Sequence, residues 1–370
     1  METKPIGILY EHPEWFAPLF AELDRRGIPY ERILAHEHHF DPADRAVPYR
    51  LVVNRVSPSS YLRDHTSAIF YTQHYLAYLA EIGVPVVNGV RAHLMETSKA
   101  RQLALLAALG IPHPRSRVVN HPDQLAPAAA ELDYPLIVKP NIGGSGALMR
   151  RFDTPGELRA ALDAGELAGI FGLDHTAIVQ EYHPAAGNSI VRVEALDDRF
   201  LYAIRIHNDA SQGFNLCPAD ICQVPEAQPA AAGDDIAFCP VDAPAKKPLK
   251  IEVADPPGRV VEDVLRIFRA AHIDVGGVEY LESERDGRLY LYDVNALSNF
   301  VTDAPTLVGF DPFARFVDYL ERRAGIARRR LAGVAEEPAP PPGHPGALWA
   351  PRALRIAHCA PGLTDHDAGG

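Results

Sequence analysis

The sequence predicts an α/β protein that begins with a parallel sheet. Short apolar runs alternate with helix-periodic segments over residues 1–95. A strand-helix-strand order of this kind implies parallel strands with helices packed on the faces of the sheet. Two features interrupt the apolar pattern later in the chain: a glycine-rich turn after a buried strand, and an acidic hairpin. Each of them is a candidate site of chemistry.

The composition is that of an ordinary globular protein. The chain has 370 residues, 47% hydrophobic and 23% charged, which allows two or three domains. Its formal net charge of -12 argues against nucleic acid as a partner. Four cysteines do not make a disulfide framework, no apolar run reaches membrane-spanning length, and the N-terminus lacks a signal-peptide pattern. We therefore expect a cytoplasmic location and no membrane partner, and leave a homo-oligomer open.

The first part of the chain supplies the alternating pattern. Strands are predicted at 6–10, 30–34, 51–56 and 84–88, and helices at 15–26 and 68–82. Parallel sheets bind ligands at the carboxyl ends of their strands. The polar residues at those ends are Glu11, His12, Asn54 and Arg55. They are candidates for a substrate edge, although ordinary loop residues explain them equally well.

A helix is predicted to begin after Thr97 or Ser98 and to stop at Gly110. Lys99 lies in its first turn, where the helix dipole is already positive and disfavours a cation. A bound anion would correct that conflict, and a solvated lysine is the simpler explanation.

The glycine-rich turn follows a short buried strand, Leu136 to Val138, that ends in Lys139. Glycine backbone can approach an anion closely, and a lysine at the base of the turn can neutralise phosphate oxygens. The turn is neither a Walker P-loop nor a dinucleotide fingerprint. A tight hairpin with a surface lysine is therefore the alternative. The residues of the turn are Gly143, Gly144, Ser145 and Gly146.

The middle of the chain continues with short elements and one unusual segment. A capped helix is predicted at 154–162, a buried strand at 177–182, and a hairpin from strands 189–196 and 200–206. Residues 216–257 are rich in Ala and Pro and read as a substrate-covering loop or a disordered insertion. Cys217 and Cys222, in that segment, do not have a zinc-binding pattern.

The acidic hairpin follows an amphipathic helix at 260–271 and precedes a last helix at 312–330. Glu279, Asp293 and Asn295 are the polar residues within its two apolar strands, 276–281 and 289–295. Asp293 and Asn295 are two residues apart, so they project from the same face. Two carboxylates beside an amide oxygen suit magnesium, whereas a solvent-facing acidic strand is the alternative.

The order of the lysines, the glycine-rich turn and the acidic hairpin along the chain resembles that of the ATP-grasp superfamily, and within it that of the RimK-type glutamate ligases and glutathione synthetases. The resemblance covers roughly 98–320 and rests on the joint order of several short motifs. They are Lys99, Lys139 with the glycine-rich turn, Gln180-Glu181-Tyr182, Asn215, Glu279, and Asp293-Val-Asn295.

The resemblance implies an ATP-grasp fold, two α+β subdomains that clasp ATP, preceded by a Rossmann-like domain. The implied boundaries are 1–95 for that first domain, 96–175 for the small subdomain with the glycine-rich lid, and 176–330 for the large subdomain with its insertion at 216–257. Residues 331–370 are expected to be a disordered tail, because Pro, Gly and Ala dominate them.

The resemblance also implies roles. Lys99 and Lys139 would hold the ATP phosphates under the lid formed by residues 143–146, and Arg205 would stabilise the transferring phosphoryl group. Gln180, Glu181 and Tyr182 would lie along the adenine. The expected metal site holds two magnesium ions, with manganese as an alternative, on Glu279, Asp293 and Asn295, and with Asn215 close by. The acidic ribose contact of the family is absent, because Asn188 and Ser189 follow Gly187; amide or hydroxyl contacts would replace it.

The implied reaction is ligation of a carboxylate to an amine. The γ-phosphate activates the carboxylate as an acyl phosphate, and the amine then displaces phosphate to leave ADP. A small-molecule kinase and a non-catalytic ATP-binding module are the alternatives. The expected partners are a small carboxylate, an amino acid or a peptide, and an amine. Arg55, Arg192 and Arg205 suggest an acidic or carboxylate-bearing substrate, although surface arginines are commonplace.

Overall fold

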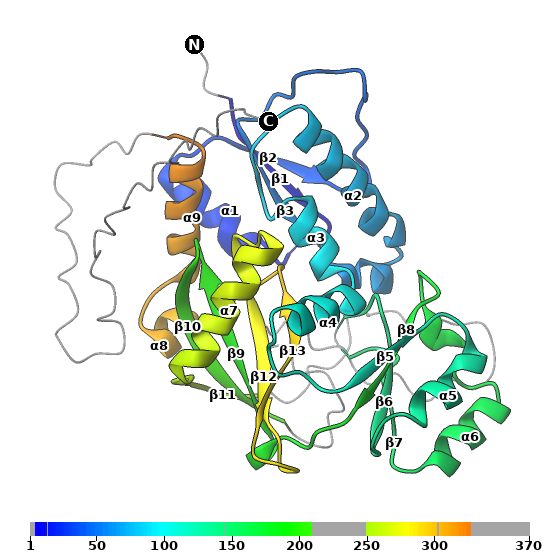
Figure 1. Ribbon diagram of the computed structural model, residues 1–370. Helices are drawn as coiled ribbons and strands as arrows, with labels where there is room; N and C mark the ends of the chain where they lie inside the picture. The colour runs from blue at the N-terminus through cyan, green and yellow to red at the C-terminus, as the bar shows by residue number, and fades with distance from the viewer. Residues whose placement is uncertain (1–3, 13, 145, 209–248, 302, 327–370) are drawn as a thin grey trace, which may run out of the picture. The chain divides into compact units, whose positions relative to one another are not determined.

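The computed structural model describes residues 4–12, 14–144, 146–208, 249–301 and 303–326. Residues 1–328 form one compact unit that contains every described element, and the predicted tail at 331–370 lies outside the described residues. Three sheets make up this unit (Figure 1). None of the described helices is long and apolar enough to cross a membrane.

The first sheet is parallel, with the strand order β2-β1-β3-β4, as the alternating pattern predicts. Strands β1 and β3 are buried along their whole length, and α1 ends at Gly27 in a left-handed conformation, φ 64°. The strands are β1 (Ile6–Tyr10), β2 (Tyr30–Leu34), β3 (Leu51–Arg55) and β4 (Val86–Val87). The helices are α1 (Ala17–Arg26), the 3-10 helix η1 (Pro58–Arg63), α2 (Thr66–Glu81) and α3 (Val90–Glu96).

The second sheet is antiparallel, with the order β5-β8-β6-β7, and carries the glycine-rich turn between β6 and β7. Thr154 caps α6 by accepting from the backbone N of Glu157 at 3.3 Å, so the predicted capped helix is confirmed. The strands are β5 (Ser116–Val119), β6 (Leu136–Pro140), β7 (Arg150–Phe152) and β8 (Ala177–Glu181). The helices are η2 (Pro122–Gln124), α5 (Leu125–Ala129), α6 (Pro155–Asp163) and η3 (Ala168–Phe171).

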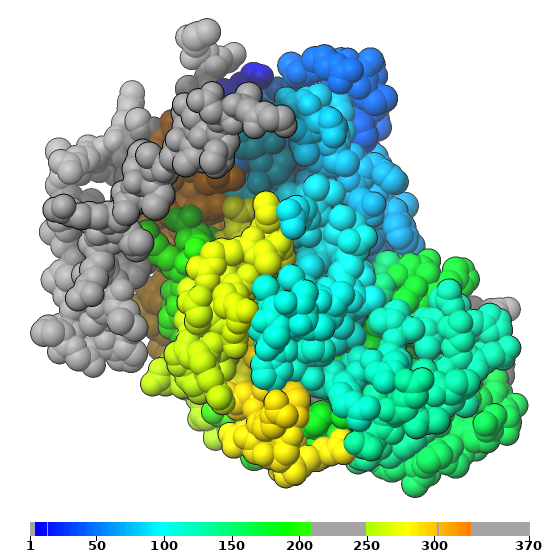
Figure 2. Space-filling view, in the orientation of Figure 1, coloured from blue at the N-terminus to red at the C-terminus, as the bar shows by residue number. Residues whose placement is uncertain are grey.

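The third sheet is also antiparallel, with the order β11-β10-β9-β12-β13. Helix α7 covers one face, and α3 and α4 lie beside it (Figure 2). The strands are β9 (Ser189–Leu196), β10 (Arg199–His207), β11 (Lys250–Val253), β12 (Val275–Glu282) and β13 (Leu289–Asn295). The helices are α4 (Lys99–Ala108), η4 (Ala186–Asn188), α7 (Gly258–Ala271), α8 (Ala304–Val308) and α9 (Pro312–Arg323).

One hydrophobic core joins the first and third sheets. Side chains of α1, β1 and β3 pack with those of β10 and α9 in a single buried cluster. Arg26 of α1 reinforces this contact by donating to Asp318 and Glu321 of α9 at 2.7 and 2.9 Å. The second sheet has a separate core of its own, centred on residues such as Leu136, Val138 and Val179. The glycine-rich turn is therefore carried by a sheet that packs independently.

The structure changes some predicted bounds. Strand β8 begins after the predicted boundary at 175, yet it pairs with β5 and β6, so the sheet of the glycine-rich turn extends to Glu181. Strand β11 lies inside the predicted insertion at 216–257 and pairs with β10. The rest of that insertion up to residue 248, with Cys217 and Cys222, lies outside the described residues. The other predicted domain boundaries stay predictions.

Candidate active site

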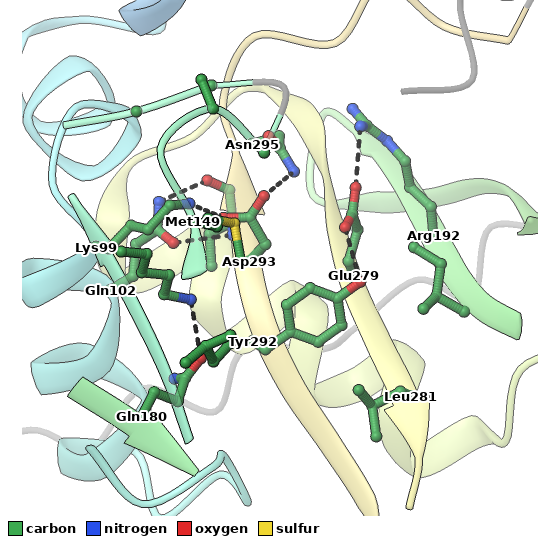
Figure 3. A pocket seen from close by; sticks show the side chains of 18 of the residues that line it. Lys99, Gln102, Met149, Gln180, Arg192, Glu279, Leu281, Tyr292, Asp293 and Asn295 are labelled. Carbon is green, nitrogen blue, oxygen red and sulfur yellow. Dashed lines mark hydrogen bonds and ion pairs between the residues drawn. The ribbon is translucent and has the colours of Figure 1, made fainter. Parts of the chain in front are cut away.

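A pocket of about 260 Å³ lies where the three sheets meet, and it gathers most of the predicted site residues. Figure 3 shows it from close by. Arg205 is not among its lining residues, and Ser145 and Asn215 lie outside the described part of the chain. The predicted residues that line it are Lys99, Lys139, Gly143, Gly144, Gly146, Gln180, Glu181, Tyr182, Asn188, Glu279, Asp293 and Asn295.

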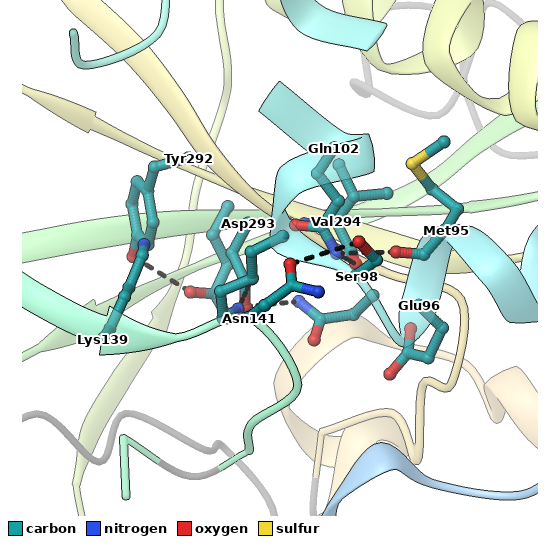
Figure 4. Close-up of polar contacts among 12 residues, drawn as sticks. Met95, Glu96, Ser98, Gln102, Lys139, Asn141, Tyr292, Asp293 and Val294 are labelled. Carbon is teal, nitrogen blue, oxygen red and sulfur yellow. Dashed lines mark hydrogen bonds and ion pairs between the residues drawn. The ribbon is translucent and has the colours of Figure 1, made fainter. Parts of the chain in front are cut away.

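Helix α4 brings Lys99 into the pocket from its first turn, as the sequence predicts. Ser98 is the N-cap, and its hydroxyl accepts from the backbone N of Arg101 at 3.3 Å. The side chain of Asn141, which follows β6, accepts from the backbone N of Ala100 at 2.8 Å (Figure 4). The start of the helix is thereby fastened to the end of the strand that carries Lys139.

The ammonium of Lys99 donates to Asp293 Oδ1 at 2.5 Å. Burial acts to lower the pKa of Lys99, but the Asp293 carboxylate outweighs it and the pKa lies above its usual value. For Asp293, burial acts to raise the pKa, and Lys99 overcomes it and holds the pKa below its usual value. The two side chains therefore form a charged pair, with a point charge facing one carboxylate oxygen.

Lys139 is more deeply buried, with 4% of its surface exposed. Its Nζ donates to Gln180 Oε1 at 2.8 Å, and Gln180 in turn donates to the Ser116 hydroxyl at 2.9 Å. Burial, and then the positive charge of Lys99, lower the pKa of Lys139 to about 7. An anion between the two lysines would favour the charged form of both.

Glu279 and Asp293 face each other across adjacent strands, because β12 and β13 pair them in register. Glu279 accepts from the Tyr292 hydroxyl at 2.9 Å and from Arg192 Nη1 at 3.4 Å. Asn295 Nδ2 donates to the second oxygen of Asp293 at 3.3 Å, which confirms that these two residues share a face. All four carboxylate oxygens thus already have a donor.

The negative charges of Glu279 and Asp293 suit a divalent cation. Burial and the neighbouring Asp293 charge raise the pKa of Glu279, which is the effect of two carboxylates held close together. A cation between them would relieve that repulsion, and oxygen ligands suit magnesium. Within the described residues no three His, Cys, Asp or Glu side chains group around one point, so the set depends on the amide oxygen of Asn295.

Three charged or polar residues around the acidic hairpin were not assigned to the nucleotide or metal site from the sequence. Glu96, at the end of α3, accepts from the backbone N of Ala296 and, at 3.2 Å, from that of Leu297. Burial, and then the Asp293 charge, raise the pKa of Glu96 to about 7. The other two are Arg192 and Tyr292. Glu96 and Arg192 meet the acidic hairpin through the folded chain, whereas Tyr292 is part of the hairpin itself. No local motif marks any of the three.

Arg192 is held by a buried carboxylate. Its Nε donates to Glu194 Oε1 at 2.7 Å, and the Ser298 hydroxyl donates to the same oxygen at 2.8 Å. Gly277 leaves room for this pair, because a Cβ there would lie 2.8 Å from Arg192 Nε and 2.9 Å from Glu194 Oε1. Burial acts to lower the pKa of Arg192, and Glu194 and Glu279 raise it. The guanidinium is therefore fully charged and already paired.

Arg205 lies on β10 beside the pocket wall. Its Nη1 donates to the hydroxyl of Ser189, a lining residue, at 3.0 Å. The Asn188 side chain donates to the backbone carbonyl of Asn208 at 2.7 Å. The structure thus connects Arg205 to the predicted ribose end through Ser189, and does not bring it to Lys99 or Lys139. Its catalytic role stays a prediction.

The Gln180 to Tyr182 end of the pocket is partly engaged within the protein. Glu181 Oε1 accepts from Arg115 Nη1 and from the backbone N of Asp133, both at 3.0 Å. The backbone N of Tyr182 donates to Pro135 O at 2.8 Å. Oε1 of Glu181 is therefore already engaged within the protein, and the adenine role of these residues stays a prediction.

The glycine-rich turn closes against the first sheet's loop. A Cβ on Gly144 would lie 2.7 Å from Ser59 Cβ, and one on Gly143 would lie 3.2 Å from Pro140 Cγ. Glycine at 144 is therefore required by close packing against η1.

The predicted substrate edge of the first sheet is largely internal. Glu11 is buried and is bound by Arg63 and His65. Arg55 is 1% exposed, donates to Ser298 O, and lies between the rings of Phe16 and Phe316. None of Glu11, His12, Asn54 and Arg55 lines the pocket.

Residues 96–216 match the RimK-like ATP-grasp domain family. Among curated proteins, the chain is 28% identical over 230 residues to the D-alanine–D-alanine ligase of Deinococcus radiodurans, which covers 60% of each chain. The chain thus spans about 60% of the length of that relative.

Solved structures share the architecture at low sequence identity. The ATP-grasp ligase PsnB in complex with a minimal precursor has a TM-score of 0.58 at 19% identity, covering 86% of this chain and 99% of the other. PsnB has also been solved with its minimal precursor, Mg and ADP. The D-cycloserine synthetase DcsG has a TM-score of 0.58 at 18% identity, covering 86% and 99%. The described residues therefore adopt an ATP-grasp fold after a parallel sheet. The chain is similar to ATP-grasp ligases, and its residues 96–216 match the RimK-like ATP-grasp domain.

Proposed function

We propose that this protein is an ATP-dependent ligase that joins a carboxylate to an amine and releases ADP and phosphate. The observation that carries the proposal is the grouping of Lys99 and Lys139 with the Glu279–Asp293 pair in one pocket, beneath the glycine-rich turn. The two lysines repel each other, and so do the two carboxylates. The negative charge of a triphosphate would relieve the first repulsion, and the positive charge of its metal ions would relieve the second. The D-alanine–D-alanine ligase relative supports the reaction class.

The lysines would bind the phosphates of ATP from two sides. Lys99 would exchange Asp293 for a phosphate oxygen. Lys139 has no carboxylate partner among the described residues and would regain its full charge on binding. Glycines 143, 144 and 146 would cover the phosphates with backbone N–H groups. Gln180, Glu181, Tyr182 and Asn188 would hold the base and ribose, with Ser145 and Asn215 completing the site from outside the described residues.

Glu279, Asp293 and Asn295 would hold magnesium, as two ions, with manganese as a substitute. The ions supply charge neutralisation to the phosphates when bound. Tyr292 and Arg192 orient the Glu279 carboxylate through its two oxygens. Arg192 would then turn its free N–H groups to the transferring phosphoryl group, with Arg205 acting from the Ser189 side.

The reaction would pass through an acyl phosphate. The carboxylate oxygen attacks the γ-phosphorus as the bond to ADP breaks, and the amine then adds to the acyl carbon as phosphate leaves and a proton is lost from nitrogen. The pocket walls position both reactants and exclude water from the intermediate. A small-molecule kinase would use the same groups for the first step alone.

The test measures ADP release with Mg-ATP over a panel of amino acids and small carboxylates, with hydroxylamine added in parallel. Acid-dependent ADP together with a hydroxamate is the expected result, because hydroxylamine traps an acyl phosphate. ADP with a stable phosphorylated product and no hydroxamate would instead identify a kinase. Nucleotide binding without any turnover would favour the regulatory module.

The remaining expectations are also proposals. We infer small-molecule or peptide substrates, no nucleic-acid or membrane partner, and a cytoplasmic location, while a homo-oligomer stays open. The net charge of -12 supports the first exclusion.

A further inference from the structure

We propose that the substrate whose side chain lies against the first sheet is an uncharged, apolar amino acid or peptide end, and not an acidic one. This inference deepens the proposed function and rests on it, since it concerns the far end of the same pocket. The pocket's cations are already engaged, the wall beyond the metal residues is mainly apolar, and two polar atoms in that wall have no partner among the described residues.

The first observation is that each described cationic side chain of the pocket is already committed. The lining lysines and arginine are Lys99, Lys139 and Arg192. Lys99 pairs with Asp293 at 2.5 Å, and Arg192 lies between Glu194 and Glu279. In the proposed reaction both lysines are assigned to the triphosphate, and the remaining N–H groups of Arg192 to the transferring phosphoryl group. A substrate carboxylate on a side chain would therefore enter beside Glu96, Glu279 and Asp293 without a cation of its own.

Two arginines that suggested an acidic substrate lie elsewhere. Arg55 is enclosed between two phenylalanine rings and bound to a backbone carbonyl. Arg205 is outside the lining and donates to Ser189. Of the three arginines that suggested an acidic or carboxylate-bearing substrate, Arg192 alone is among the described lining residues, and it is paired with Glu194 and Glu279.

The second observation is the wall itself. Beyond Asn295, the chain lines the pocket with Leu297, Asn299 and Phe300. The first sheet's loops add Trp15 and Pro58 with the hydroxyls of Ser57 and Ser59, and the two hydroxyls bond each other at 2.8 Å. Such a surface accepts an apolar side chain, since its large groups are aromatic or aliphatic and its hydroxyls satisfy one another.

Trp15 is fixed in this wall by its neighbours. Its indole stacks on the His12 ring, with centroids 4.4 Å apart, and the Arg63 guanidinium lies 5.0 Å from its ring. Arg63 is anchored in turn by the buried Glu11 carboxylate at 2.5 Å. The cluster at the end of β1 therefore holds an aromatic surface rigidly at the edge of the pocket.

The third observation is a donor and an acceptor with no partner. Trp15 Nε1 and Asn299 Oδ1 are both buried and make no hydrogen bond within the described residues, and both side chains line the pocket. Buried polar groups nearly always form hydrogen bonds, so we expect a ligand or a water molecule to bond these two atoms. An indole N–H suits a carboxylate or carbonyl oxygen, and an amide oxygen suits an ammonium. An amino acid presents both groups next to its side chain.

The experiment compares amino acids that differ in side-chain charge. ADP release is measured with Mg-ATP for leucine, phenylalanine and valine against glutamate and aspartate, with glutamine as the neutral analogue of glutamate. The expected result is a kcat/KM at least a hundredfold higher for an apolar amino acid than for glutamate. A preference for glutamate or aspartate, with hydroxamate formation intact, would overturn the inference and leave the proposed function standing.

A binding measurement separates this inference from the reaction. If no amino acid releases ADP, calorimetry of the same amino acids on the protein loaded with Mg-ADP decides it. Tighter binding of the apolar set supports the inference although the proposed function then fails. Tighter binding of the acidic set, or no binding by either, overturns it.

Trp15→Phe tests the indole N–H, because it retains an aromatic ring. We expect KM for the preferred amino acid, or its Kd, to rise about tenfold, while the Kd of Mg-ADP stays within twofold. Tyr78→Phe is the matched control, since it removes a hydroxyl that donates to Asp44 O on the first domain away from the pocket. An unchanged KM in Trp15→Phe would remove the indole from substrate binding.

Discussion

Two carboxylates of this molecule, the buried Glu11 and the half-buried Asp293, form ion pairs of the same length, yet their surroundings are opposite. Glu11, after β1, is bound at 2.5 Å by Arg63, whose Nε donates to it as well, and at 2.6 Å by His65. Asp293, in the pocket, is bound at 2.5 Å by Lys99 and has the like charge of Glu279 beside it.

The difference separates a structural pair from an exchangeable one. An arginine fork with a second donor satisfies Glu11 completely, and a fork loses much of its binding if one partner moves. A lysine offers a single point of charge, and the repulsion between Glu279 and Asp293 leaves a demand for more positive charge than Lys99 supplies. The Lys99–Asp293 pair is therefore the one suited to exchange its partners for a ligand.

The largest expected effect comes from removing the charge of the exchangeable pair. Asp293→Asn should lower turnover about a thousandfold, because it removes a metal ligand worth several kcal/mol to the reaction. The melting temperature should change little, since the loss of a partner for Lys99 is offset by relief of the repulsion with Glu279. ADP release and a thermal melt measure both. Asp286→Asn, in the turn of the same hairpin, is the control and should stay active; an active Asp293→Asn would remove this residue from the metal site.

The structural pair should respond in the opposite way. Glu11→Gln leaves Arg63 without its carboxylate and should lower the free energy of unfolding by about 3 kcal/mol, while the Kd of Mg-ADP stays within twofold. Urea denaturation and calorimetry measure these. Glu14→Gln, an exposed position nearby, is the control.

The pH dependence sharpens this prediction. Burial acts to raise the pKa of Glu11, but Arg63 and His65 overcome it and the pKa lies below 4.5. A lowered pKa contributes stability that is complete above pH 4.5 and is lost as the pH falls through the folded value. The difference in unfolding free energy between the wild type and Glu11→Gln should therefore shrink below pH 4.5. A difference that grew on acidification would contradict the pairing.

A smaller effect tests whether the Arg192–Glu194 pair is a structural pair, like that of Glu11, or matters for the reaction, like that of Asp293. Gly277→Ala places a Cβ within 3 Å of both side chains, so the pair must shift. We expect turnover to fall about tenfold and stability by about 1 kcal/mol. Gly258→Ala, at the start of α7 with no atom within 4 Å, is the matched control. Equal activity in the two variants would show that the position of Arg192 does not matter for the reaction.

The smallest expected effect is the uptake of a fraction of a proton by Lys139 when a nucleotide binds. Lys139 has a pKa of about 7 in the absence of ligand, so at pH 8 it is mostly neutral. A bound phosphate favours the ammonium, so binding of Mg-ADP should take up protons above pH 7, and its affinity should fall as the pH rises. Calorimetry at pH 8 in buffers of different ionisation enthalpy measures the uptake. Lys139→Arg, permanently charged, should abolish it; an unchanged uptake would assign the proton to another group.

The sequence predicts the elements whose signals are local. The cap at Ser98 and the capping pattern at Thr154 locate α4 and α6, because a capping side chain bonds within its own first turn. Strand β11 was missed, since a short edge strand that is largely exposed has no buried alternation to mark it. Helix α3 was missed as well, and with it the carboxylate of Glu96.

The residues of the candidate site also divide into those with a local sequence signal and those without one. Lys99, Lys139, Glu279, Asp293 and Asn295 stand in short motifs with their own pattern, and the structure brings them into one pocket. Glu96 reaches Ala296 across 200 residues, and Trp15 approaches the same pocket from the first sheet. Those contacts depend on how the sheets pack together, which no local pattern records. Arg205 has a suitable charge but lies on β10, which β9 and β12 separate from β13 in the sheet, and it does not line the pocket.

The close fit of Gly144 against Ser59 has a consequence for how this protein can diversify. The loops after β1 and β3 carry Trp15 and Pro58 of the apolar wall, whereas the other sheets carry the lysines and the acidic hairpin. Exchanging those two loops would alter substrate choice and leave the nucleotide machinery in place. Position 59 restricts the exchange, because a larger residue there would push the glycine-rich turn away from the pocket. Specificity can therefore drift at Trp15 and Pro58, while residue 59 has to stay small.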